Sequence, residues 1–488
     1  MNVEPKGGWI KLLADPQDVD AKNVGADREK PEPQQGPLDQ GSSVRPGQLA
    51  KDGRSTEESI AQEWVANHSL DWRYDHQVGK WFHWDGAIWR EDLTKLATQL
   101  IREHTRAAAA LPVPGSKDQK PQSSLARASV VKGAELFCQI DQRIAVEHGV
   151  WNQDPLLLGT PAGTVDLQTG KLRTSDRSAM ITRSTSVAPA TGAPTRWLQF
   201  VDEATNGDAE LARFLQIALG YCLTGSTQEH ALFFAYGAGK NGKSVFLNTA
   251  TRIMGDYAVT AAMDTFTASR GDKHPTELAR LDGARLVAAS ETEEGRAWAE
   301  SRIKQLTGGD RIAARFMRND FFEFTPAFKL FIVGNFQPSL HNVDEATRRR
   351  FNIIPFIHTP AHPDPQLEGK LSREYPQILA WMIEGALLWQ NEGLTRPDVV
   401  RAATDLYFEE QDLFGQWLQD FCTLRTGALS RPKELFESWR QFALDSGEEP
   451  GTQKAMAAKL RKQQIEPYRS GGIRFYRGVE LRRGEQAT

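Results

Sequence analysis

Residues 237–244 read Gly-Ala-Gly-Lys-Asn-Gly-Lys-Ser, which is a complete G-x-x-x-x-G-K-[ST] sequence. This pattern is typical of a loop whose backbone N–H groups cradle phosphates, with Lys243 reaching the β- and γ-phosphates and Ser244 holding Mg²⁺. The apolar run 231–236 predicts a buried strand before the loop, and residues 244–250 predict a helix after it. The sequence therefore predicts a nucleotide site, with a plain glycine-rich surface turn as the alternative.

Downstream of the loop, apolar runs alternate with helical patterns as far as residue 358, which indicates an α/β core of βαβ units. A nucleotide triphosphatase needs a carboxylate at the end of a second strand to orient metal and water. The run 285–290 is followed by Glu291, which we assign to this position, with Glu293 in reserve. Another apolar run, 329–334, ends at Asn335, whose amide can orient an attacking water.

Three cationic segments accompany this core. Residues 304–310 read Lys-Gln-Leu-Thr-Gly-Gly-Asp, and residues 311–324 predict a β-hairpin with Arg318 at its tip. Residues 348–350 are three consecutive arginines before the apolar strand 353–356. Such a cluster is either a solvated charge run or the source of an arginine finger for a neighbouring subunit's nucleotide.

The flanking segments predict further units. Residues 1–55 are rich in Pro, Gly and polar residues and predict a disordered arm. Residues 56–194 predict a mixed domain of helices and hairpins, with turns at Asp85-Gly86 and within 163–172. Its tryptophans around 81–89 suit a core better than base stacking. We expect the core at 195–360, a helical region at 361–425 and a winged-helix domain at 426–488.

The last segment is basic within a chain of net charge −4, which carries 59 Lys and Arg against 63 Asp and Glu. Such a local patch is an electrostatic footprint for duplex phosphates, with an ordinary solvated surface as the alternative. The cations that we expect to contact DNA here are Lys454, Lys459, Arg461, Lys462, Arg469, Arg474 and Arg477.

Composition excludes several other classes. Three widely separated cysteines give neither a common zinc pattern nor a disulfide framework, which fits a reducing cytosol. The N-terminus has no secretion signal, and no run of 18 apolar residues exists, so we expect a cytoplasmic protein without a membrane segment.

These motifs together resemble the superfamily 3 helicases of the phage and plasmid primase-helicase type, which includes the poxvirus primase-helicases. The resemblance covers most of residues 60–483 and implies an AAA+-like P-loop core. It implies that Lys243 and Ser244 bind the ATP phosphates and Mg²⁺, with Glu291 as the acidic residue at the metal. It also implies that Asn335 is a polar sensor and that Arg350 is the arginine finger, with Arg349 as runner-up. It further implies that the hairpin with Arg315 and Arg318 grips single-stranded DNA in a pore. The nucleotide contacts implied are Gly237, Gly239, Lys240, Asn241, Gly242, Lys243, Ser244, Val245 and Lys304.

The expected function is an ATP-driven DNA helicase that forms a ring, a hexamer by analogy, during replication of a phage or mobile element in a bacterial cytoplasm. The first 55 residues cannot house a primase, so we expect a separate protein to supply priming. The alternative is a DNA-binding P-loop ATPase that acts as a regulator without unwinding. A small-molecule kinase would leave the basic tail and the arginines without a purpose.

Overall fold

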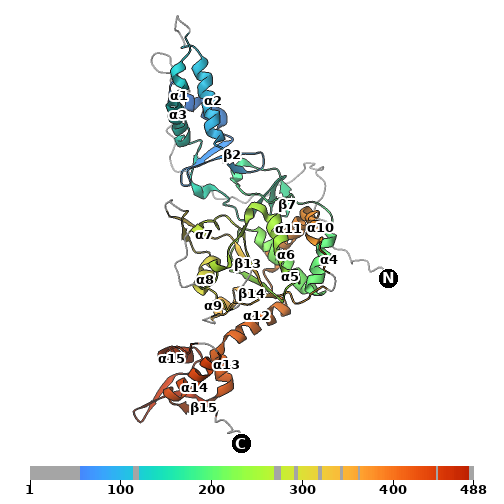
Figure 1. Cartoon of the computed structure of the whole chain (residues 1–488), viewed down its shortest axis with the longest axis vertical. Coiled ribbons are helices and arrows are strands. Elements are labelled where there is room, and N and C mark those ends of the chain that lie inside the picture. Colours follow the sequence, from blue (N-terminus) through green and yellow to red (C-terminus); the bar gives the residue numbers. More distant parts are fainter. Residues whose placement is uncertain are drawn as a thin grey trace, which may run out of the picture.

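The computed structural model describes residues 55–113, 120–268, 276–290, 295–316, 321–340, 344–360, 363–446 and 449–482. Residues 1–54 of the predicted disordered arm, Glu291, Glu293 and Arg318 lie outside the described residues. The chain forms three units in a row along its long axis: α1–α3 at one end, an α/β unit in the middle, and α13–α15 at the other end (Figure 1).

A five-stranded parallel sheet is the centre of the middle unit. Its order is β14-β8-β13-β10-β9, so the first strand of the sheet lies between the last two. The predicted α/β class is therefore confirmed as a mixed α/β fold with a parallel sheet. The three-residue edge strand was not predicted from the sequence. The strands are β8 (Leu232–Tyr236), β9 (Ala258–Thr260), β10 (Leu286–Ser290), β13 (Lys329–Gly334) and β14 (Phe351–Pro355).

Helices cover both faces of this sheet. Successive side chains along each strand point to opposite faces, so these apolar strands contribute to a core on each side. Phe233 and Phe331 enter one core together with α5 (Ala209–Leu223), α6 (Lys243–Met254) and α11 (Tyr375–Glu392). Phe234 enters the other core, with α8 and α12. The remaining helices of this unit are α4 (Thr195–Thr205), α7 (Thr276–Ala279), α8 (Glu300–Gly308), α9 (Glu345–Arg348), α10 (Leu367–Ser372) and α12 (Asp398–Gln411).

Two smaller sheets accompany the middle unit. The predicted hairpin at 311–324 is confirmed as β11 (Ile312–Ala314) paired with β12 (Phe322–Phe324). The hairpin predicted within 163–172 is also confirmed, in the sheet β5 (Leu157–Thr160), β6 (Gly163–Asp166) and β7 (Lys171–Arg173). Leu158 and Val165 pack into the core of the middle unit. This small sheet therefore packs with the middle unit, although the predicted boundary at 194 placed it in the N-terminal domain.

The N-terminal unit has its own core beneath a small sheet. Trp64, Trp72, Trp81 and Trp89 are buried, and Trp81 packs edge to face against both Trp64 and Trp72. Their burial confirms the core interpretation over base stacking. The elements are α1 (Glu57–His68), β1 (Trp72–Asp75), β2 (Lys80–Trp84), β3 (Trp89–Glu91), α2 (Leu96–Ala110), α3 (Ala128–Ile140) and β4 (Ala145–Val146).

The C-terminal unit is a three-stranded antiparallel sheet packed against three helices. Its core includes Phe414 and Trp417, so it begins ahead of the predicted boundary at 426. The expected order of two helices followed by a hairpin is confirmed, and a preceding helix and strand complete the unit. The elements are α13 (Leu413–Phe421), β15 (Cys422–Ser430), α14 (Pro432–Asp445), α15 (Gln453–Lys462), β16 (Pro467–Ser470) and β17 (Ile473–Leu481), in the sheet order β15-β17-β16.

Candidate nucleotide and nucleic-acid site

The glycine-rich loop joins the carboxyl end of β8 to the start of α6. Gly239, Lys240 and Gly242 have φ values of 99°, 55° and 85°, so the backbone turns sharply through left-handed conformations. A side chain at Gly242 would fall 2.8 Å from the ring of Phe200 on α4, which leaves no room for one. No side chain caps the N-terminus of α6, so its first N–H groups have no side-chain acceptor. Such a terminus attracts an anion.

Lys243 is buried beneath this loop, with 5% of its surface exposed. Its Nζ donates hydrogen bonds to the carbonyl of Gly237 over 2.8 Å and to Oδ1 of Asn241 over 2.7 Å. Burial lowers the pKa of Lys243, because desolvation disfavours its charged form. Ser244 follows on the exposed side of the first turn, and Val245 is half-buried against the core. The loop and the lysine thus form one compact structure at the sheet edge.

Asn335 lies at the same edge as the loop. Gly334 of β13 pairs with Tyr236 of β8, so Asn335 and Gly237 follow at matching positions on neighbouring parallel strands. Asn335 is exposed. Ser290, which precedes Glu291, pairs with Val333 one position earlier. In open α/β sheets, ligands bind outside the carboxyl ends of the strands where the strand order reverses, and this edge is such a point.

The arginine cluster lies at the opposite end of the strands, beside their amino ends. Arg350 precedes the amino end of β14, whereas Gly237 follows the carboxyl end of β8 beside it. Along the strand direction, Arg350 and Gly237 are six residues apart, which corresponds to about 20 Å. Arg350 is buried: its Nε donates to Oγ1 of Thr307 over 3.1 Å, and its Nη1 donates to the carbonyl of Ala346 over 2.6 Å. Arg349 is exposed.

Lys304 lies on the same surface as these arginines. Its Nζ forms an ion pair with Oδ2 of Asp344 over 2.5 Å. Burial alone would raise the pKa of Asp344, but the hydrogen bonds from Lys304 and Thr347 lower it to about 2. Sequence reasoning missed Asp344 and Thr307. The sequence feature that could have identified Asp344 is its position directly before Glu345, because Asp is a favoured N-cap residue. In the structure, Asp344 does cap the N-terminus of α9.

The predicted DNA contacts fall on two other surfaces. Beside the hairpin β11–β12, the guanidinium of Arg315 lies 4.7 Å from the centre of the Phe321 ring. All seven predicted cations of the C-terminal unit are exposed. Lys459 also lies over the rings of Phe414 and Trp439, so part of its role is to cover the core.

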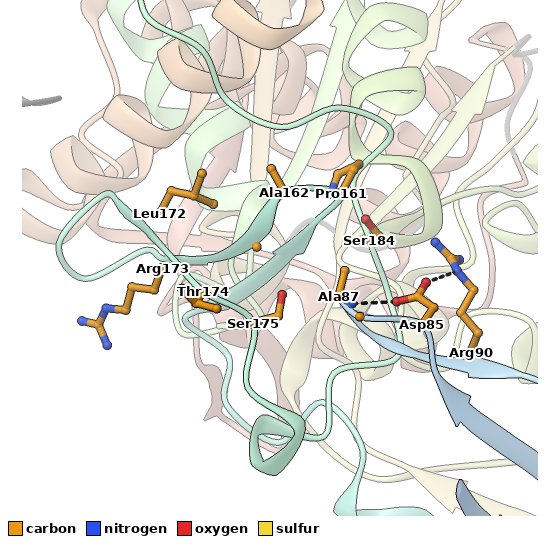
Figure 2. Close-up of a pocket in the computed structure, with 12 residues that line it drawn as sticks. Asp85, Ala87, Arg90, Pro161, Ala162, Leu172, Arg173, Thr174, Ser175 and Ser184 are labelled. Atoms are coloured by element: carbon orange, nitrogen blue, oxygen red, sulfur yellow. Dashed lines mark hydrogen bonds and ion pairs between the residues drawn. The ribbon is translucent and has the colours of Figure 1, made fainter. Parts of the chain in front are cut away.

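The cavity drawn in Figure 2 lies away from the glycine-rich loop, between the Asp85 turn and the sheet β5–β7. It encloses about 600 Å³. The charge of Arg90 at its rim is paired with Asp85 over 2.8 Å, and Arg173 points away from the hollow (Figure 2). The cavity therefore offers no unpaired cation to a nucleotide. We place the candidate nucleotide site at the loop, where left-handed turns lead into the uncapped N-terminus of α6.

Two further features concern the described part of the chain. There, no cluster of three or more His, Cys, Asp or Glu side chains is arranged to hold a metal ion. Among the same residues, none of the helices combines the length and the apolar character that crossing a bilayer requires.

Two family models match the chain. One is described as D5 N terminal like and matches residues 59–206, and the other is a family of unknown function (DUF5906) that matches residues 235–350. A helicase-named protein of Acanthamoeba polyphaga mimivirus is 26% identical over 235 residues, which is 44% of this chain and 24% of that protein. Another, from Frog virus 3, is 28% identical over 252 residues, which is 47% of this chain and 26% of that protein.

The chain thus spans about a quarter of the length of these curated relatives. A solved structure of the NrS-1 C-terminal region without ligand matches with a TM-score of 0.51 at 10% identity. The match covers 88% of this chain and 100% of that structure. At this identity the likeness concerns the fold alone.

Proposed function

This chain belongs to the D5-like primase-helicase family, and from that premise we propose that it is an ATP-dependent helicase that unwinds DNA as a ring of subunits. The observation that carries the proposal is the loop 237–242, which turns through left-handed conformations into the uncapped N-terminus of α6, where Lys243 is buried. We further propose that the ring acts in replication of a phage or mobile element, with priming supplied by a separate protein.

The residues at the loop fit a nucleotide triphosphate with Mg²⁺. The first turn of α6 and the left-handed loop residues would hold phosphate oxygens, and the ammonium of Lys243 would neutralise their charge. Ser244 is exposed, and its hydroxyl would bind the metal. Glu291 would supply a carboxylate to the same metal. Asn335 would orient water at the γ-phosphate from the neighbouring strand. When bound, ATP supplies the free energy that drives movement along DNA.

The arginines support a site shared between subunits. A guanidinium at the amino edge of the sheet cannot reach phosphates about 20 Å away at the carboxyl edge of the same subunit. It can reach the nucleotide of the next subunit in a head-to-tail ring. Because Arg350 is buried and bonded to Thr307 and Ala346, we propose that its exposed neighbour Arg349 is the finger. Lys304 would have to exchange Asp344 for a phosphate to contribute.

The DNA contacts are proposed on two surfaces. The hairpin β11–β12, with Arg315 held on Phe321, would contact single-stranded DNA inside the ring. The C-terminal unit would act as a winged helix that binds duplex DNA through its exposed cations. Lys459 is the exception, because two core rings already engage its ammonium. The alternative is a regulator that binds DNA through the same C-terminal surface without unwinding it. A strand-displacement assay distinguishes the two functions, because only a helicase displaces a strand.

Replacing the loop lysine tests the proposal. In Lys243→Ala, the phosphates lose their buried cation, so ATP hydrolysis should fall by about 100-fold or more and strand displacement should stop. Hydrolysis is measured with and without single-stranded DNA, beside displacement of a labelled strand. The matched control is Lys370→Ala, which removes a surface lysine that forms an ion pair with Asp364. Unwinding by the Lys243→Ala protein at the rate of the control would contradict the proposal.

A further inference from the structure

The side chain of Asn241 is buried between Lys243 and the end of β14. Only 3% of its surface is exposed. Its Oδ1 accepts a hydrogen bond from Nζ of Lys243 over 2.7 Å, and its Nδ2 donates to the carbonyl of Phe356. Phe356 directly follows β14, and its backbone N–H donates to the carbonyl of Tyr236 over 2.8 Å. The amide therefore ties the lysine to the rigid sheet instead of to the loop alone.

Close packing around Gly237 shows that the loop backbone is shaped around this contact. A Cβ at Gly237 would overlap both the carbonyl of Phe356 and Nδ2 of Asn241. Only a residue without a side chain lets the backbone pass this close while the amide reaches Phe356. The carbonyl of Gly237 in turn accepts the second hydrogen bond from Lys243. Two of the three ammonium donors are thus fixed, and one direction is left for a ligand.

We infer that Asn241 is a positioning residue that orients the ammonium of Lys243 toward the phosphates; this inference rests on the proposed nucleotide site. An amide suits the place because it accepts from a cation on one side and donates to a carbonyl on the other. A carboxylate of the same shape would lose the donor to Phe356 and would place a negative charge beside incoming phosphates. A lysine without the tether has four rotatable bonds, and misplacement by about 1 Å can cost about 100-fold in rate.

The test is a double-mutant cycle that isolates action through the lysine. Asn241→Ala should weaken ATP binding by about 10-fold and lower the kcat of ATP hydrolysis by about 10-fold to 100-fold. Asn241→Asp should bind ATP more weakly than Asn241→Ala, because its carboxylate repels the phosphates. In the Lys243→Ala background, adding Asn241→Ala should change ATP affinity by less than about twofold, since the residue through which it acts is gone. Affinity is measured with a fluorescent ATP analogue at a temperature where all variants are folded.

The outcomes separate this inference from the proposed function. If Asn241→Ala weakens ATP binding equally with and without Lys243, the residue only supports the loop, and the inference is overturned. Wild-type turnover by Asn241→Asp would overturn it as well. If Lys243→Ala alone leaves ATP binding and hydrolysis unchanged, the proposed nucleotide site itself fails.

Discussion

Arg349 and Arg350 are adjacent in the chain, yet the fold gives them opposite environments. The guanidinium of Arg350 turns inward to Thr307 of α8 and to the carbonyl of Ala346. Arg349 remains exposed, and its backbone carbonyl accepts a hydrogen bond from Arg396 over 2.5 Å. The backbone of Arg349 is therefore held in place while its side chain faces outward, which is what a residue reaching into a partner subunit requires.

Replacing each arginine separates the two roles. Arg349→Ala should lower the kcat of ATP hydrolysis by about 1,000-fold while ATP affinity changes little, because a finger stabilises charge that develops in the transition state. Arg350→Met should lower the free energy of unfolding by about 2 kcal/mol, because the buried Thr307 hydroxyl and Ala346 carbonyl lose a charged donor. Steady-state kinetics and denaturant titrations measure the two effects. The assignment is reversed if Arg350→Met is stable and inactive while Arg349→Ala hydrolyses ATP normally.

His148 forms a bridge between the N-terminal unit and the middle unit. Nδ1 of His148 lies 2.7 Å from Oδ2 of Asp75 on β1, and its Nε2 lies 3.2 Å from Oδ2 of Asp282, which follows α7. Trp151 also donates to Asp75, over 2.9 Å, and Arg183 donates to the carbonyl of Asp282. The hydrogen bonds to Asp282 and Asp75 raise the pKa of His148 to about 9. Burial opposes this shift but does not cancel it.

This bridge predicts a pH-dependent attachment between the two units. A histidine whose folded pKa is raised stabilises the folded state fully below its unfolded pKa, near 6.5, and this contribution is lost as the pH rises through about 9. The melting temperature of His148→Gln should therefore lie well below that of the natural protein at pH 6, and the difference should shrink by pH 10. His76→Gln, which alters an exposed histidine, is the control. A difference that stays constant across this range would show that His148 acts by packing alone.

The arrangement of the whole molecule places its candidate sites on separate surfaces. The loop 237–242 and Arg349 lie at opposite edges of one sheet, and α12 connects that unit to the basic C-terminal unit (Figure 1). No single copy of the chain can bring Arg349 to its own loop, because strands of fixed length separate them. A head-to-tail ring would bring the two edges together at every interface.

Mixing two inactive variants tests this assembly. Lys243→Ala subunits keep Arg349, and Arg349→Ala subunits keep the loop, so a mixed ring contains interfaces with both intact. In a random equimolar mixture, about one interface in four is complete, and ATP hydrolysis should recover toward that fraction of the natural rate. Hydrolysis is measured after mixing, with each variant alone as control, and particle mass is followed in ATP by sedimentation. A mixture as inactive as its components, in rings of normal mass, would contradict a shared site.

Sequence patterns predicted the elements of this site well, and for a simple reason. Buried strands such as 231–236 and 329–334 are continuous apolar runs bounded by polar residues, and they became β8 and β13. Because the carboxyl ends of parallel strands lie on the same side of a sheet, Asn335 was expected beside the loop. The pairing of β13 with β8 places it there. The edge strand Ala258–Thr260 was missed because three residues give no period to detect. Burial of Arg350 was also missed, because a triplet of arginines carries no sign of which member turns inward.

The amino-acid sequence specifies the local chemistry of this protein without reference to the fold: a glycine-rich loop with a lysine, polar ends on buried strands, and a basic C-terminal segment. These follow from residue type and spacing, which act over one turn of helix or one strand. Folding of distant segments against one another is what lets Asn241 tie Lys243 to Phe356, leaves Arg349 exposed, and makes His148 join two units. Each of these features depends on contacts between segments far apart in the chain or on differences in burial between neighbouring residues. Local sequence patterns do not predict such contacts or such differences.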